Sequence, residues 1–151
     1  MAYIIAPSLI AKYAEIFLQF LESKTNRMVW GAMIALSTIA GEVPKDIWPH
    51  RGKILELIKT GTVITNVAGV KTLINMSKAE DCFYNDLFEE LFQLQKDCRD
   101  IDFAKRAEDM WPAIRPPHRD AFVKLLEERK PALSKAAQKR LEKVMKNIAD
   151  G

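Results

Sequence analysis

Apolar residues recur along this chain at intervals of three and four positions, the spacing that places side chains on one face of an α-helix. The first such face runs from Leu9 to Leu21, and similar faces recur near Ile54, Leu91 and Leu125. The pattern predicts an all-α protein. The predicted helices span residues 8–23, 26–40, 45–60, 64–78, 80–96, 100–114, 116–130 and 134–148.

Prolines and polar residues mark the ends of these segments. Pro44 and Pro116 suit the first turn of a helix, where a missing amide proton costs nothing. Asn26 and Ser134 can cap helix N-termini through their side-chain oxygens. The β-branched stretch 62–67 favours a strand by composition, but its apolar positions still fit a helix.

The helical pattern repeats along the chain. A shift of 37 positions places apolar residues on apolar residues in two separate stretches, for example Ile10 on Ile47. A shift of 34 adds a fourth copy, with Leu91 on Leu125. Amphipathic helices can be slid into register by chance, but here one offset serves both helices of a pair. The pattern predicts a single domain, 1–151, of four helix pairs at about 1–42, 43–79, 80–115 and 116–151.

The second helix of the first pair gives this repeat a family resemblance. Residues 28–40 are apolar almost all round, so this helix must be covered on several sides. Paired helices of about 37 residues, an opening proline and the segment 26–36 resemble HEAT repeats, an α-solenoid class related to armadillo repeats. The family pattern of an early arginine and valine is met by Arg27 and Val29, whereas Ile64 replaces the arginine in the second pair.

The resemblance implies a fold and a range of functions. HEAT repeats stack into a right-handed α-α superhelix whose inner helices line a concave surface that holds partners. Members of the family are mostly scaffolds and adaptors for proteins. A smaller branch binds nucleic acid and includes DNA glycosylases that remove alkylated bases. Because one fold serves many functions, the residues of the site must decide between them.

Composition limits the class of protein. The chain has 151 residues, 48% of them hydrophobic and 28% charged, which is the balance of a globular domain. The cysteines, Cys82 and Cys98, fit a reducing compartment. No apolar run reaches the roughly 18 residues that a membrane span requires. We therefore expect a cytoplasmic protein that does not bind a membrane.

Positive charge concentrates on the predicted inner helices. The net charge of the chain is +3. The charges of the predicted first helices of the pairs sum to −2 and those of the second helices to +5, of which 134–148 carries +4, whereas 100–114 carries −2. A lysine-rich terminal helix can also serve only to keep the end of a repeat array soluble. The predicted binding residues in polar positions of the inner face are Lys71, Asn75, Lys105, Arg106, Lys139, Arg140 and Lys143.

No set of residues indicates catalysis, a cofactor or a metal. The two cysteines lack the further ligands of a zinc site, and His50 and His118 have no nucleophile motif beside them. Three carboxylates lie close together in the sequence, at Asp97, Asp100 and Asp102, and could supply oxygen ligands to a cation. The glycine and the glutamate that a calcium-binding loop requires are missing. Aspartates of this kind more often stabilise helix N-termini.

Three hypotheses follow for the function. The first is a non-enzymatic scaffold or adaptor that binds an acidic segment of a protein partner on the concave face. The alternative is a nucleic-acid-binding relative of the HEAT-like DNA glycosylases, in which Asp109 beside Trp111 is the only candidate for the catalytic aspartate. The third is self-association through the apolar stretch 2–5.

Overall fold

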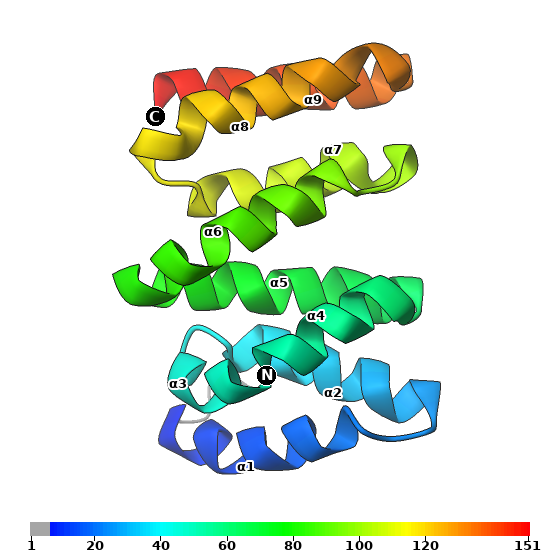
Figure 1. Cartoon of the computed structure of the whole chain (residues 1–151), viewed down its shortest axis with the longest axis vertical. Coiled ribbons are helices and arrows are strands. Elements are labelled where there is room, and N and C mark those ends of the chain that lie inside the picture. The colour runs from blue at the N-terminus through cyan, green and yellow to red at the C-terminus, as the bar shows by residue number, and fades with distance from the viewer. Residues whose placement is uncertain (1–6) are drawn as a thin grey trace. The chain divides into compact units, whose positions relative to one another are not determined.

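The computed structural model describes residues 7–151, and side chains from residue 12 onward, and this part of the chain is helical without any β-strand (Figure 1). The all-α prediction is confirmed. The α-helices are α1 (Pro7–Phe20), α2 (Asn26–Ile39), α3 (Pro44–Ile47), α4 (Arg51–Thr60), α5 (Val63–Ala79), α6 (Asp81–Lys96), α7 (Asp100–Met110), α8 (Pro116–Arg129) and α9 (Lys135–Asp150). Short 3-10 turns lie at Trp48–His50 (η2), Trp111–Ala113 (η3) and Lys130–Ala132 (η4).

Internal prolines shorten two of the predicted helices. The segment predicted as 45–60 is divided into α3 and α4 by the 3-10 turn that contains Pro49. The segment predicted as 100–114 leaves the α-helix after Met110, and Pro112 lies in the following 3-10 turn. Proline lacks the amide proton that an interior helical turn needs, and its ring clashes with the carbonyl group of the preceding turn.

The structure also tests the predicted caps. The hydroxyl of Ser134 accepts a hydrogen bond from the amide of Ala137 at 3.2 Å, so its role as N-cap of α9 is confirmed. The prediction for Asn26 was wrong by one position, because Asn26 is the first residue of α2 and Thr25 occupies the cap. The stretch 62–67 enters a helix, since the hydroxyl of Thr62 caps α5 by accepting from the amide of Thr65.

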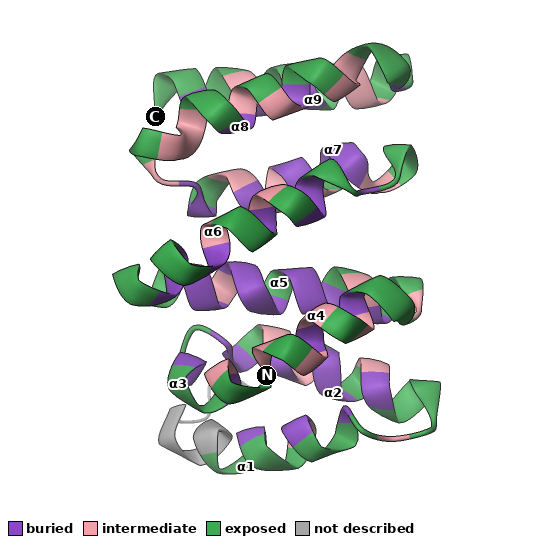
Figure 2. Ribbon diagram, viewed as in Figure 1, coloured by how far each residue is buried: buried purple, intermediate pink, exposed green. Residues whose placement is uncertain are grey.

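The described chain forms two compact units, Met1–Asn85 and Asp86–Gly151, which divide within α6. In the first unit, α2 packs against both α1 and α5, and α4 packs against α5. α2, which is apolar on almost all of its faces, is therefore covered on two sides. Its sequence predicts such burial. Figure 2 shows the buried positions along α2 and α5. Fully buried side chains of this unit include Met33, Leu36, Ile54, Leu73 and Met76.

Close contacts fix α5 against its neighbours. At Gly69, a Cβ atom would lie 2.6 Å from Cγ1 of Ile58 on α4, so the two helices approach at a position where only a hydrogen fits. On the side facing α2, Nδ2 of Asn75 donates a hydrogen bond of 2.8 Å to the carbonyl oxygen of Ser37. This carbonyl lies in the last turn of α2, where helix carbonyls lack intrahelical partners.

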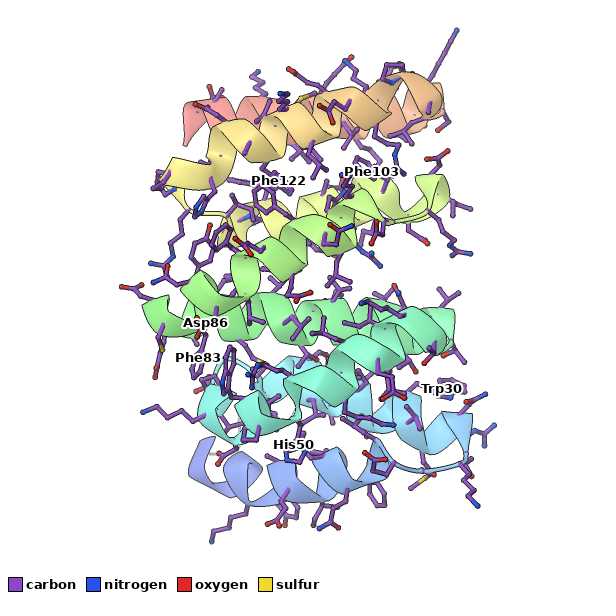
Figure 3. The ribbon with its side chains drawn as sticks, viewed as in Figure 1. Trp30, His50, Phe83, Asp86, Phe103 and Phe122 are labelled. Atoms are coloured by element: carbon purple, nitrogen blue, oxygen red, sulfur yellow. The ribbon has the colours of Figure 1, made fainter. Side chains whose placement is uncertain are left out.

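The second unit has an equivalent arrangement. α7 packs against α9, and α8 also contacts α9. Phe103 of α7 and Phe122 of α8, both labelled in Figure 3, are fully buried. The ring of Phe122 lies 5.6 Å from that of Phe92 on α6. Further buried residues of this unit are Leu91, Ala107, Met110, Leu126, Leu141 and Val144.

Each unit thus contains the contact that stacked helix pairs need. The second helices of consecutive pairs touch directly, α2 with α5 in one unit and α7 with α9 in the other. A superhelix through all four pairs, and their union in a single domain, stay predictions. No helix within residues 7–151 is both long enough and apolar enough to cross a membrane.

Candidate interaction surface

Five of the seven predicted binding residues belong to α7 and α9, which lie side by side in the second unit. We call the exposed face of these two helices the α7/α9 surface. On α9, the apolar residues Leu141, Val144 and Ile148 are buried, which fixes the orientation of the helix. Lys139 and Lys143 therefore face solvent, and both are exposed.

Arg140 is bound to α7 rather than free for a partner. Its Nε donates a 3.0 Å hydrogen bond to Oε2 of Glu108, and its Nη2 donates to Oε1 of the same carboxylate. Such a two-bond pair is stronger and more specific in geometry than a single contact. The hydrogen bond from Arg140 lowers the pKa of Glu108, partly opposed by desolvation and assisted by the charges of Arg140, Lys105 and Lys143. The same bond raises the pKa of Arg140.

Two predicted residues on α7 are also engaged within the chain. Nζ of Lys105 lies 2.9 Å from Oδ1 of Asp109, one turn further along the helix. Nη1 of Arg106 donates a 3.0 Å hydrogen bond to the carbonyl oxygen of Leu94, near the end of α6. Arg106 is therefore directed to the neighbouring helix, whereas Lys105 stays exposed beside its carboxylate.

The remaining two predicted residues, Lys71 and Asn75, lie on α5 in the other unit. Lys71 is exposed, whereas the half-buried Asn75 donates to the carbonyl oxygen of Ser37. The structure brings together Lys105, Lys139, Arg140 and Lys143 on the α7/α9 surface. A single inner face that unites all seven predicted residues stays a prediction.

Three residues of the α7/α9 surface were missed by the sequence reasoning. Lys135 and Lys146 extend the exposed basic side of α9 in both directions. The four-residue spacing of Lys135, Lys139 and Lys143 could have revealed the first of them. Ile101 on α7 is 83% exposed. No sequence signal could have found it, because its apolar character alone predicts burial.

Among the candidate catalytic and metal-binding aspartates, Asp100, Asp102 and Asp109 each form an ion pair with a different lysine or arginine. Asp109, the candidate catalytic aspartate, pairs with Lys105, and Trp111 lies half-buried in η3. Asp102 pairs with Arg99 at 2.7 Å, whereas Asp100 pairs with an arginine of α8. Among residues 12–151, no group of three or more histidines, cysteines or carboxylates is placed to hold a metal ion.

The two histidines lie in different settings. His50, labelled in Figure 3, is exposed. It lines a hollow of about 290 Å³ with Lys12, Glu15 and Asp46. His118, in the first turn of α8, is half-buried, and its ring stacks on Phe88 with centroids 4.1 Å apart. The second unit also has an open groove of about 480 Å³ between α8 and α9, which is lined by both charged and apolar residues.

Comparison with known proteins finds no matching family model, no matching curated protein and no matching solved structure. The resemblance to HEAT repeats therefore stays a prediction from the sequence pattern. The class that the structure establishes is an all-helical protein. Its function has to be argued from the α7/α9 surface itself.

Proposed function

We propose that this chain is a non-enzymatic interaction module whose α7/α9 surface binds an acidic segment of a partner protein. One observation carries the proposal. Lys139 and Lys143 are exposed and make no ion pair with any residue that the structure describes, whereas their neighbour Arg140 is paired with Glu108. Their charge is therefore available to an anionic partner.

Ile101 favours a polypeptide as that partner. It is 83% exposed and shares one face of α7 with Lys105 and Glu108, at a spacing of four and then three residues. Since Glu108 contacts α9 through Arg140, this face adjoins the lysines. An exposed branched apolar side chain beside positive charge suits a peptide with both acidic and apolar residues better than a phosphate backbone.

The helix-pair packing supports a HEAT-like adaptor as the wider class. In that class, inner helices hold partners, and the repeat pattern of the sequence predicts α7 and α9 as inner helices. Both cysteines are free thiols, which fits the proposed cytoplasmic location. The alternative, nucleic-acid binding in the manner of the HEAT-like glycosylases, has less support. Asp109 is already paired with Lys105 and so is not an unengaged base.

The test is the binding of fluorescent acidic peptides and of a fluorescent DNA duplex, measured by anisotropy. We expect the chain to bind a peptide that contains glutamates and leucines, and Lys139→Glu with Lys143→Glu to abolish binding. The matched control, Lys59→Glu with Lys124→Glu, changes the net charge equally at exposed positions of α4 and α8.

Two results would contradict the proposal. The first is the absence of peptide binding at about 50 mM salt, where electrostatic attraction is strong. The second is tighter binding of the duplex than of the peptide, with a steep dependence on salt, which would favour the nucleic-acid alternative. An intact melting temperature of each variant confirms that the charge reversals leave the fold unchanged.

A further inference from the structure

Four lysines form a straight row along the exposed face of α9. Lys135, Lys139 and Lys143 follow one another at four-residue steps, and Lys146 lies three residues further. At about 100° per residue, the four positions fall within about 80° of the helix circumference, and at 1.5 Å per residue they span about 16 Å. All four are exposed. We call these residues the lysine row.

Carboxylates lie along both edges of the lysine row, and each already has a cation. On one edge, Oε1 of Glu142 lies 2.9 Å from Nζ of Lys130 in η4. On the other edge, Glu108 of α7 is bound by Arg140. Within the part of the chain that the structure describes, none of the four row lysines makes an ion pair of its own. The row is therefore the part of α9 whose lysines have no ion-pair partner among the described residues.

We propose that the lysine row binds an acidic α-helix of the partner that carries carboxylates at every fourth residue. This inference rests on the proposed function and specifies the partner of the same surface. Two helices have the same rise, so carboxylates at four-residue steps repeat about every 6 Å, which matches the repeat of the lysines. An adjacent acidic helix can then place one carboxylate against each lysine.

The narrowness of the row argues against broad anionic surfaces. A DNA duplex or a lipid bilayer would bring negative charge over the edges of the row as well as over its centre. Glu142 and Glu108 lie at those edges, already paired with Lys130 and Arg140, so the edges offer no unpaired positive charge to such a surface. A single helix presents its charge along one line and avoids both carboxylates.

The spacing of the row is fixed before any partner arrives. Leu141, Val144 and Ile148 hold the opposite face of α9 in the core, with exposed fractions of 0%, 2% and 7%. The hydroxyl of Ser134 caps the first turn. Because the helix is already formed, binding does not require ordering of its backbone, which reduces the entropic cost of association.

The test compares two peptides of identical composition, each rich in alanine. In the spaced peptide, glutamates occupy every fourth position, and in the scattered peptide the same glutamates are distributed around the helix. Dissociation constants are measured by anisotropy, and peptide helicity by circular dichroism. We expect the spaced peptide to bind at least about tenfold more tightly, because it can form all its ion pairs at once.

Matched variants locate the binding. The row variant carries Lys135→Gln, Lys139→Gln, Lys143→Gln and Lys146→Gln. The control variant carries Lys45→Gln, Lys59→Gln, Lys78→Gln and Lys124→Gln, which are exposed lysines elsewhere with the same total change of charge. We expect the row variant to lose at least about tenfold in affinity for the spaced peptide and the control variant to lose less than about twofold.

The outcomes separate this inference from the proposed function. Equal binding of both peptides, weakened by the row variant, would overturn the requirement for helical spacing but leave an acidic segment as the partner. Equal weakening by the row and control variants would overturn the assignment to the lysine row. If neither peptide binds at about 50 mM salt, the inference fails, and the peptide of glutamates and leucines then decides the proposed function separately. A DNA duplex that binds more tightly than all the peptides would overturn both.

Discussion

The guanidinium of Arg129, in the last turn of α8, donates a 2.7 Å hydrogen bond from Nη1 to the carbonyl oxygen of Cys98 in the α6–α7 connection. The same nitrogen lies 3.0 Å from Oδ1 of Asp100, and Nη2 donates to the carbonyl oxygen of Lys96. Its guanidinium carbon also lies 4.8 Å from the centre of the Phe103 ring. One side chain therefore joins three helices of the second unit.

Replacement of this side chain should destabilise the fold. We expect Arg129→Ala to lower the free energy of unfolding by about 2 kcal/mol, because two backbone carbonyls lose a charged donor at once. Arg129→Lys should fall between wild type and alanine, since an ammonium lacks the planar array of donors. Urea unfolding gives the measurement. Lys124→Ala on the exposed side of the same helix is the control, with an expected change within about 0.5 kcal/mol.

The contact between α4 and α5 predicts opposite effects for two glycine substitutions. Gly69→Ala should destabilise the protein by about 1–3 kcal/mol, because the new methyl group would overlap Cγ1 of Ile58. Gly31→Ala, on α2, meets nothing within 4 Å and should stabilise the protein by about 0.5–1 kcal/mol through helix propensity. Thermal unfolding followed by circular dichroism compares both. A stabilising Gly69→Ala would mean that the helices are further apart than described.

The ion pair of Glu108 and Arg140 predicts a dependence of stability on pH. Because the folded state lowers the pKa of Glu108 below its ordinary value of 4.5, the pair stabilises the protein above that pH. This contribution is lost as the pH falls through the lowered pKa. Both side chains are partly exposed, so we expect only about 0.5–1 kcal/mol. Glu108→Gln should cost this amount near pH 7 and progressively less as the pH falls below 4.5, as measured by urea unfolding.

A control on the same chain makes this measurement specific. Glu128 on α8 is exposed and makes no ion pair within the described residues. Glu128→Gln should therefore change the unfolding free energy by nearly the same small amount at about pH 3 and at about pH 7. The assignment is disproved when Glu108→Gln differs from wild type equally at about pH 3 and about pH 7.

The two cysteines should differ in reactivity. Cys98 is 5% exposed, and burial raises the pKa of its thiol, although nearby arginines oppose the shift. Cys82 is exposed at the start of α6. Since the thiolate is the reactive form, iodoacetamide at about pH 8 should modify Cys82 rapidly and Cys98 only on unfolding. Peptide mass spectrometry measures each site, with the urea-unfolded chain as reference. Equal rates in the folded protein would contradict the burial of Cys98.

The fold at the level of helices was largely predictable from the sequence. Apolar spacing located the helical segments, and a hydroxyl at Ser134 was enough to predict a cap. The missed breaks at Pro49 and Pro112 have a local cause, because the apolar spacing continues through both prolines while the backbone does not. Asn26 failed as a cap by one position, which is the usual uncertainty of helix boundaries.

The candidate site was only partly predictable. Charge patterning correctly assigned Lys139 and Lys143 to an exposed helical face. It could not distinguish them from Arg140, since that arginine is bound to Glu108, which lies 32 positions earlier in the sequence. The sequence likewise predicts Asn75 to be a polar surface residue. In the structure, its side-chain amide donates a hydrogen bond to the carbonyl oxygen of Ser37. In both cases the partner comes from a different helix pair.

The sequence by itself determined which segments are helical and where polar caps can begin them, because helix periodicity and capping act over a few residues. Only the tertiary structure decided which charged side chains form ion pairs within the protein and which stay exposed without one. Ion pairs such as Arg140 with Glu108 and contacts such as Gly69 with Ile58 depend on how separate helices approach one another. That approach is set by packing across the core, which no local pattern specifies.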